Sequence, residues 1–283
     1  MSGTRAPAVA GLFYPAEADV LRAQVQLHLA ATPPPVAATR PPVAPTDPLP
    51  DVRALVVPHA GYVYSGPTAG IAYRQLFALA GRVRRILLLG PPHVVPVLGV
   101  AASGAHHWRT PLGDVTVDDE GRAALVTVSR ADGVPWLVVV DDDPHVREHS
   151  LEVQLPFIQV ALPGAAVLPV LVGDGPVDAI AGLLDAWWCD DALIVVSTDL
   201  SHYEPQHSAQ RHDARTAAAI VEADPDAIGD RDACGARALR VLLTMAAQRG
   251  ATISELDRRT SADTAGTPDR VVGYGAFAVQ APC

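Results

Sequence analysis

The chain has 283 residues, of which 49% are hydrophobic and 18% are charged, and its formal net charge at pH 7 is −10. A chain of this length and apolar content can bury a large core, and its excess of acidic residues argues against a nucleic-acid partner, which would need a basic face. All 21 basic residues are arginine, which excludes a Schiff-base lysine and the lysine of a phosphate-binding P-loop.

The sequence also carries information on the cell compartment. Residues 1–15 contain no continuous apolar segment of the kind found in secretion signals, and no stretch approaches the ~18 apolar residues of a membrane-spanning helix. The three cysteines, Cys189, Cys234 and Cys283, are too far apart in sequence to indicate a disulfide framework. We therefore predict a cytoplasmic protein that does not act on a membrane.

A proline-rich segment interrupts the first part of the chain. Residues 32–50 hold eight prolines and almost no large apolar side chain, which is typical of an extended loop. Because only 31 residues precede this segment, it is predicted to be a surface loop within one domain that spans residues 1–283, and not a linker between domains.

After this loop, short β-branched runs alternate with amphipathic stretches. The candidate strands are 54–57, 85–89, 98–102, 137–140, 166–172, 193–197 and 271–279, and the candidate helices are 67–80, 120–128, 147–161, 176–188, 208–223 and 235–248. Continuously apolar strands such as 86–89 and 193–196 are typical of a sheet buried on both faces. The alternation predicts an α/β domain with a central, mostly parallel or mixed sheet covered by helices on both faces.

Three histidines follow candidate strands. His59 and His93 come directly after the runs that end in Val57-Pro58 and Gly90-Pro91-Pro92, and His202 follows the strand that ends near Ser197. Loops beyond the carboxyl ends of buried parallel strands converge at one edge of the sheet, where ligands bind in open α/β folds. A single histidine in this position is usually a hydrogen-bonded loop residue, but the repetition favours a shared site.

Cys234 is the fourth candidate. It precedes a predicted helix start at Gly235, and a thiol at a helix N-terminus has a lowered pKa and binds metals readily. The alternative is a buried structural cysteine. His207 and His212 lie five residues apart on a predicted helix and therefore do not share a face, so we interpret them as surface residues.

Seven segments of the chain resemble the Memo family, known in prokaryotes as AmmeMemoRadiSam system protein B. They are 8–15 (AVAGLFYP), 58–66 (PHAGYVYSG), 89–93 (LGPPH), 148–157 (EHSLEVQLPF), 197–203 (STDLSHY), 233–235 (ACG) and 271–275 (VVGYG). The family resembles the class III extradiol ring-cleaving dioxygenases in fold, so the resemblance implies that architecture here.

The resemblance also implies roles for individual residues. His59 and His93 are expected to bind a metal ion, and Cys234 stands where the dioxygenases use glutamate. His202 falls at the position of an acid/base histidine, with Asp199 beside it in the catalytic site. Asp199 lies three positions before His202, so it is expected to orient the His202 imidazole and to raise its pKa. In the motif around His59, Tyr62 and Tyr64 are expected to line the substrate pocket.

The expected cofactor is one transition-metal ion. A thiolate ligand favours iron(II) or copper and also accommodates zinc. The resemblance favours a non-haem, dioxygenase-like oxidoreductase acting on a small molecule or peptide. Two alternatives stay open: a non-enzymatic module for metal handling or phosphopeptide binding, and a zinc hydrolase with Asp199 as its base. The family name further implies a radical-SAM enzyme and a third small protein as partners.

Overall fold

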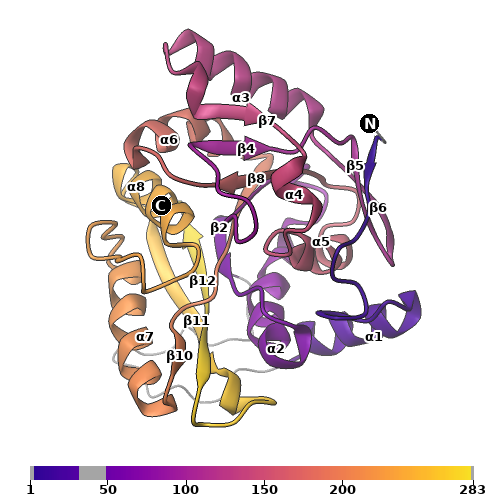
Figure 1. Cartoon of the computed structure of the whole chain (residues 1–283), viewed down its shortest axis with the longest axis vertical. Coiled ribbons are helices and arrows are strands. Elements are labelled where there is room, and N and C mark those ends of the chain that lie inside the picture. Colours follow the sequence, from indigo (N-terminus) through magenta and orange to yellow (C-terminus); the bar gives the residue numbers. More distant parts are fainter. Residues whose placement is uncertain (1–2, 32–48, 282–283) are drawn as a thin grey trace.

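A central sheet of nine strands organises residues 3–31 and 49–281, the part of the chain that the computed structural model describes (Figure 1). Its strands are β2 (Val52–Val57), β3 (Arg85–Gly90), β4 (Val100–Ala102), β7 (Val138–Val140), β8 (Ala166–Val172), β9 (Ala192–Ser197), β10 (His202–Glu204), β11 (Thr252–Thr260) and β12 (Val271–Gln280). The spatial order is β10-β12-β2-β9-β3-β8-β4-β7, and β11 also pairs with β12. The proline-rich segment predicted at 32–50 lies outside the described residues except for its last two positions.

The middle of the sheet is parallel and its flanks are mixed. Strands β2, β9, β3 and β8 run parallel to one another, whereas β12 is antiparallel to β2 and β4 is antiparallel to β8. A smaller sheet has the order β1-β5-β6, from β1 (Thr4–Arg5), β5 (His107–Thr110) and β6 (Gly113–Thr116). The predicted mixed, mostly parallel sheet is therefore confirmed.

Helices complete the fold on both faces of the central sheet. They are α1 (Ala18–Leu29), α2 (Tyr62–Tyr73), α3 (Asp119–Ala131), α4 (Asp143–Val146), α5 (Leu155–Ala161), α6 (Val177–Leu184), α7 (Gln206–Val221) and α8 (Ala236–Gln248). Short 3₁₀ turns are η1 (Arg74–Leu79), η2 (Pro135–Leu137), η3 (Glu152–Gln154), η4 (Asp185–Trp187) and η5 (Ser261–Asp263). No helix within the described ranges is long and apolar enough to cross a membrane.

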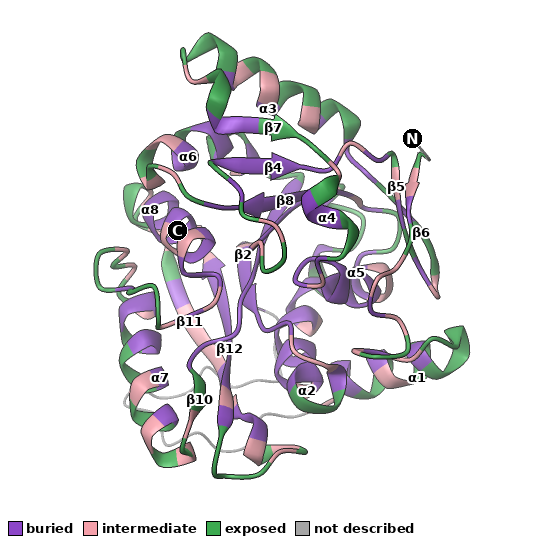
Figure 2. Ribbon diagram, in the orientation of Figure 1, coloured by how far each residue is buried: buried purple, intermediate pink, exposed green. Residues whose placement is uncertain are grey.

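Two hydrophobic cores lie on opposite faces of the sheet. In β3, Ile86 and Leu88 belong to the core that α1, α2 and α5 cover, whereas Leu87 and Leu89 belong to the core under α6, α7 and α8. Successive strand side chains point to opposite faces, so a strand between two cores must be apolar throughout. Figure 2 shows the resulting contrast between buried strands and helices that keep an exposed outer side.

Two predicted helices begin elsewhere than expected. Helix α2 begins at Tyr62 and contains Pro67, which the sequence marked as a start; the backbone N–H of Tyr62 donates to the carbonyl of Phe13 outside the helix. The helix predicted over 147–161 is broken, because the Glu148 carboxylate accepts the backbone N–H groups of His149 and Ser150. This turn is followed by η3, and α5 starts only at Leu155.

Candidate metal centre

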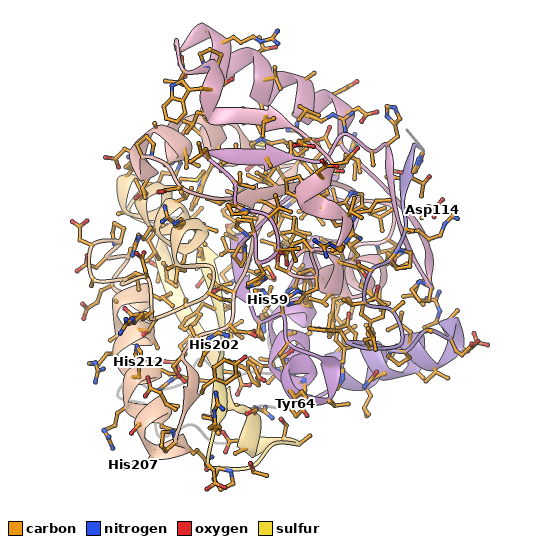
Figure 3. The ribbon with its side chains drawn as sticks, in the orientation of Figure 1. His59, Tyr64, Asp114, His202, His207 and His212 are labelled. Atoms are coloured by element: carbon orange, nitrogen blue, oxygen red, sulfur yellow. The ribbon has the colours of Figure 1, made fainter. Side chains whose placement is uncertain are left out.

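The site forms where the carboxyl ends of three neighbouring strands meet. Strand β9 lies between β2 and β3 and is parallel to both, so their carboxyl ends share one edge of the sheet. His59 follows β2, His93 follows β3 and Asp199 follows β9. The predicted convergence of these strand ends is therefore present, and Figure 3 places His59 near the centre of the molecule.

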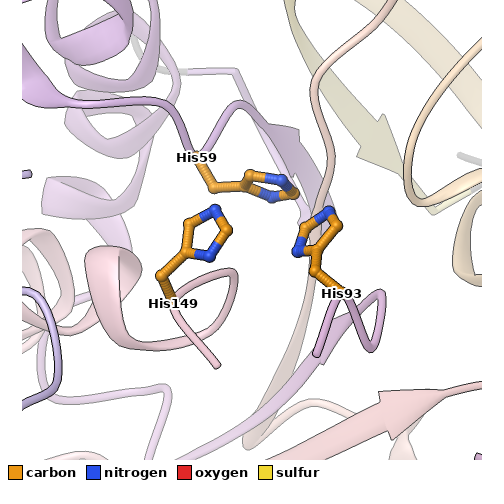
Figure 4. Close-up of side chains that lie close together, drawn as sticks. All are labelled: His59, His93 and His149. Carbon is orange, nitrogen blue, oxygen red and sulfur yellow. The ribbon is translucent and has the colours of Figure 1, made fainter. Parts of the chain in front are cut away.

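A histidine that the strand-end pattern did not select completes a cluster of three. The nearest ligand atoms of His59, His93 and His149 all lie within 4.8 Å of one another, the one group of three or more His, Cys, Asp or Glu side chains in 3–31 and 49–281 to do so. The ring centroids are separated by 5.2 Å for His59–His93, 5.5 Å for His59–His149 and 4.9 Å for His93–His149 (Figure 4). His59 is buried, His149 is half-buried and His93 is exposed, so the cluster reaches the surface on one side.

Hydrogen bonds fix the tautomer of His59. The Ser197 hydroxyl donates its single proton to the carbonyl of Ser150 at 2.6 Å and accepts a proton from the Gln154 amide at 2.8 Å. Its remaining contact, 3.0 Å from Nδ1 of His59, must therefore be an acceptor for an N–H on that nitrogen. Nε2 of His59 then carries a lone pair. Burial, and secondarily the neighbouring His93, hold the pKa of His59 well below its usual value, which keeps the ring in the neutral form that metals bind.

His93 is oriented by a buried carboxylate. Nδ1 of His93 lies 2.9 Å from Oε1 of Glu148, and the backbone N–H of His93 donates to the other carboxylate oxygen. Burial alone would raise the pKa of Glu148, but hydrogen bonds from the His93 ring and from the Ser150 backbone outweigh it and lower the pKa to about 2. An ionised acceptor keeps the proton on Nδ1, so Nε2 of His93 is the nitrogen available to a ligand.

His149 comes from a turn between α4 and η3. Its ring packs 4.7 Å from the ring of Phe13, from the N-terminal segment, and burial lowers its pKa. Because it follows no strand, the strand-end rule could not find it. The one local sign is its place directly after Glu148, since histidines that bind metals are commonly supported by a carboxylate.

Cys234 contacts the same cluster through His59. Its Sγ lies 3.2 Å from Nε2 of His59 and accepts the backbone N–H of Asp199 at 3.3 Å. The predicted lowering of its pKa is wrong: burial, together with the negative charge of Asp199, raises the pKa of the thiol to about 12. The helix begins only at Ala236, so desolvation outweighs the favourable end of the dipole. The thiol therefore donates its proton to Nε2 of His59.

Asp199 and His202 lie at the site but do not form the expected pair. Asp199 accepts the backbone N–H of His59 at 2.7 Å, and burial raises its pKa to about 7. His202, at the start of β10, contacts the carbonyl of Leu200 through Nδ1 at 2.7 Å. The expected raising of the His202 pKa by Asp199 is wrong, because burial lowers it. The loop places Asp199 under the His59 backbone instead.

The two tyrosines of the motif around His59 have different surroundings. Tyr62 is buried and its hydroxyl donates to the carbonyl of Val153 at 2.7 Å, so the hydroxyl is already bonded inside the protein. Tyr64 is 38% exposed and lies below His59 in the view of Figure 3. A role for either in a substrate pocket stays a prediction.

The donor atoms suit a transition-metal ion. Lone pairs on His59 and His93, with His149 and Cys234 beside them, offer nitrogen and sulfur, whereas the carboxylates of Glu148 and Asp199 are occupied by backbone and ring N–H groups. Donors to one ion with bonds of ~2.1 Å to nitrogen and ~2.3 Å to sulfur lie roughly 3.2–3.6 Å apart. The separation of 3.2 Å between Cys234 Sγ and His59 Nε2 is compatible with a shared ion.

Comparison with known proteins agrees with the resemblance seen in the sequence. The family model described as Memo-like protein matches residues 5–278. A MEMO1 family protein of Methanopyrus kandleri is 36% identical over 294 residues, covering 96% of this chain and 98% of the relative, and one of Sulfolobus acidocaldarius is 34% identical over 285 residues, covering 95% and 97%. A solved structure of an uncharacterized Escherichia coli K12 protein matches with a TM-score of 0.48 and 14% identity, over 80% of this chain and 99% of that one. The chain belongs to the Memo family.

Proposed function

We propose that this protein binds one transition-metal ion through Nε2 of His59 and Nε2 of His93, that His149 and Cys234 supply further donors, and that the ion serves oxidation–reduction chemistry. The observation that carries the proposal is that one ring nitrogen from each of the three imidazoles lies within 4.8 Å of the other two. Hydrogen bonds to Ser197 and Glu148 place the lone pair of two of them on Nε2. In His59 the metal ion would replace the thiol proton that Cys234 donates to this nitrogen.

The donor types favour iron, copper or zinc over ions that prefer oxygen ligands. Imidazole and thiolate suit iron, copper and zinc, whereas magnesium, calcium and manganese prefer oxygen ligands. Iron(II) and copper both change oxidation state, and either would supply electron transfer or oxygen activation when bound. The donor set of His59, His93 and Cys234 accommodates all three ions. We favour iron(II) and copper over zinc because only these two can serve the oxidation–reduction chemistry that we propose.

His202 provides a candidate proton acceptor beside this centre. Its Nδ1–H donates to the Leu200 carbonyl, so in the neutral ring Nε2 carries the lone pair. Burial lowers its pKa, which keeps that lone pair available near neutral pH. The charge that His202 carries when it is protonated also contributes to lowering the pKa of His59, as expected for a neighbour. We assign it proton transfer to or from a substrate, without a role in holding the metal.

Metal content of single-residue variants tests the ligand set. The protein is purified without oxygen, and bound iron, copper and zinc are quantified. His59→Ala and His93→Ala should lose most of the metal, and His149→Ala and Cys234→Ala should each lower affinity by about 10-fold or more. The exposed His207 provides the matched control, since His207→Ala should keep full occupancy. Full occupancy in both His59→Ala and His93→Ala would refute the proposal.

A second candidate function is metal handling without turnover. The observation that favours it is the number of donors: three imidazoles and a thiol are enough to fill a tetrahedral ion, and catalytic sites usually keep one position open. Binding of azide to the metal-loaded protein separates the two functions. A spectral change on azide addition, with oxygen consumption, favours the oxidoreductase. A spectrum that azide does not change, together with no oxygen consumption, favours metal handling.

A further inference from the structure

A histidine outside the cluster is bonded through both of its ring nitrogens. On α7, Nδ1 of His212 lies 2.8 Å from Oε1 of Glu204, and Nε2 lies 2.7 Å from Oδ1 of Asp232. Only the imidazolium form has an N–H on both nitrogens, so His212 is a cation between two carboxylates. Burial opposes this charge, but the bonds to Asp232 and Glu204 outweigh burial and raise the pKa of His212. The side chain is only 15% exposed, which protects the bridge from solvent.

The two carboxylates belong to segments that carry site residues. Glu204 ends strand β10, which begins at His202. Asp232 comes two positions before Cys234 in the chain. Figure 3 shows His212 on α7, with His202 nearer to His59 than His212 is in that view. His212 therefore connects the strand of His202 to the turn at residues 228–234, which leads into Cys234 and is called the Cys234 turn below.

Hydrogen bonds hold that turn at several points. The second oxygen of Asp232 accepts the backbone N–H of Gly229 at 2.7 Å. Arg240 of α8 donates to the carbonyl of Ile228 at 2.7 Å. At the end of the turn, the backbone N–H of Cys234 donates to the carbonyl of Asp199 at 3.2 Å. The hydrogen bond between His212 and Asp232 ties this turn to α7.

We propose that His212 is a positioning residue that holds the Cys234 sulfur against Nε2 of His59. Charge-assisted bonds to two carboxylates are stronger and more directional than neutral ones, so the bridge restricts how far the Cys234 turn can move from β10. The inference rests on the proposed function, in which Cys234 is a metal donor. It also changes the interpretation of His212, which the sequence presented as a surface residue.

His207 is the matched control on the same helix. It is exposed, and its ring hydrogen-bonds to Arg211, a neighbour on α7. The variant His207→Ala therefore measures the effect of removing a histidine from α7 while the bridge from His212 to Glu204 and Asp232 stays in place.

Cobalt(II) loading provides the test, because a thiolate bound to this ion gives a charge-transfer absorption that nitrogen ligands do not. The band should be present in the native protein and absent in Cys234→Ala. His212→Ala should weaken the band relative to the d–d absorption of the same ion and lower cobalt affinity by about 10-fold, as for other residues that support ligands from behind. His207→Ala should leave both unchanged. A general loss of stability would not change the ratio of the two absorptions.

If His212→Ala does not fold, Glu204→Gln provides a second variant, because the two side chains are nearly equal in size. Glu204→Gln should also weaken the charge-transfer band. In the metal-free protein, iodoacetamide should label Cys234 faster in these variants than in the native chain, with Cys189 as internal reference. An unchanged absorption ratio and labelling rate in His212→Ala and Glu204→Gln would overturn the positioning role while leaving the metal centre intact. A native protein without a Cys234-dependent band would instead refute the sulfur ligand, and with it this inference.

Discussion

Glu148 and Glu152 are both fully buried and lie four positions apart, yet their contacts differ. Glu148 supports the ring of His93, whereas Glu152 pairs with Arg5 at 2.7 Å and accepts the Tyr14 hydroxyl at 2.6 Å. The first contact orients a histidine of the proposed metal centre, and the second ties the N-terminal segment to the fold.

Glu148→Gln should lower metal affinity by about 10–100-fold, because the ionised acceptor that orients His93 is lost. Glu152→Gln should instead lower the free energy of unfolding by about 3–5 kcal/mol, since it leaves the buried guanidinium of Arg5 without its counter-charge. Isothermal titration on the folded protein and urea denaturation measure the two effects. Equal metal affinity in the native protein and Glu148→Gln would contradict the orienting role.

At the scale of single residues, the sequence predicted those side chains whose position follows from a strand. His59 and His93 lie where the ends of β2 and β3 place them. His149 could not be found this way, because its position depends on how a turn between two helical segments packs on Phe13. The pKa of Cys234 was predicted in the wrong direction, because its burial comes from residues distant in sequence.

Among the elements, α1 and α2 approach closely enough to need glycine at the contact. A Cβ added to Gly70 of α2 would lie 2.2 Å from the carbonyl oxygen of His28 in α1, which is backbone and cannot turn away. In α6, a Cβ added to Gly182 would meet nothing within 4 Å. The two glycines therefore give opposite expectations for the same substitution.

Gly70→Ala should lower the free energy of unfolding by about 1–3 kcal/mol, because α1 and α2 must separate. Gly182→Ala should raise it by up to about 1 kcal/mol, the helix-propensity difference between the two residues. Thermal denaturation followed by circular dichroism measures both. A neutral or stabilising Gly70→Ala would show that the two helices can part without loss.

The elements that the sequence revealed are those with an apolar pattern of their own. The buried strands β3, β8 and β9 were predicted within a residue at each end. Strand β11 was missed because it is a sheet-edge strand with the polar sequence TISELDRRT, which has no apolar run. The segment 147–161 reads as one helix in sequence, but Glu148 holds its own turn through His149 and Ser150 and also bonds to His93, 55 positions away. The sequence pattern does not reveal that last contact.

For the molecule as a whole, buried neutral histidines predict sensitivity to acid. Burial lowers the pKa of both His28 and His145 to about 4. The unfolded chain takes up these protons near pH 6.5, whereas the folded chain resists them until about pH 4. Their stabilising contribution is therefore complete above pH 6.5 and is lost as the pH falls from 6.5 to 4.

Urea denaturation of the metal-free protein across this range measures the effect. His28→Leu replaces the titrating ring by an apolar side chain that still packs against α2. This variant should flatten the dependence of stability on pH. The exposed His207 again provides the control, because His207→Ala should not change the slope. A slope unaltered by His28→Leu would contradict the assignment to this side chain.

The order of the strands has a consequence for the synthesis of the protein on the ribosome. Strand β9, although it is synthesised after β2 and β3, lies between them in the sheet. A nascent chain that has only just passed residue 93 therefore contains two of the histidines but lacks the strand that aligns the loops that carry them. Until residues 192–197 emerge and insert, β2 and β3 have no common neighbour. The metal site that we propose therefore takes its folded geometry only after at least two thirds of the chain has been translated.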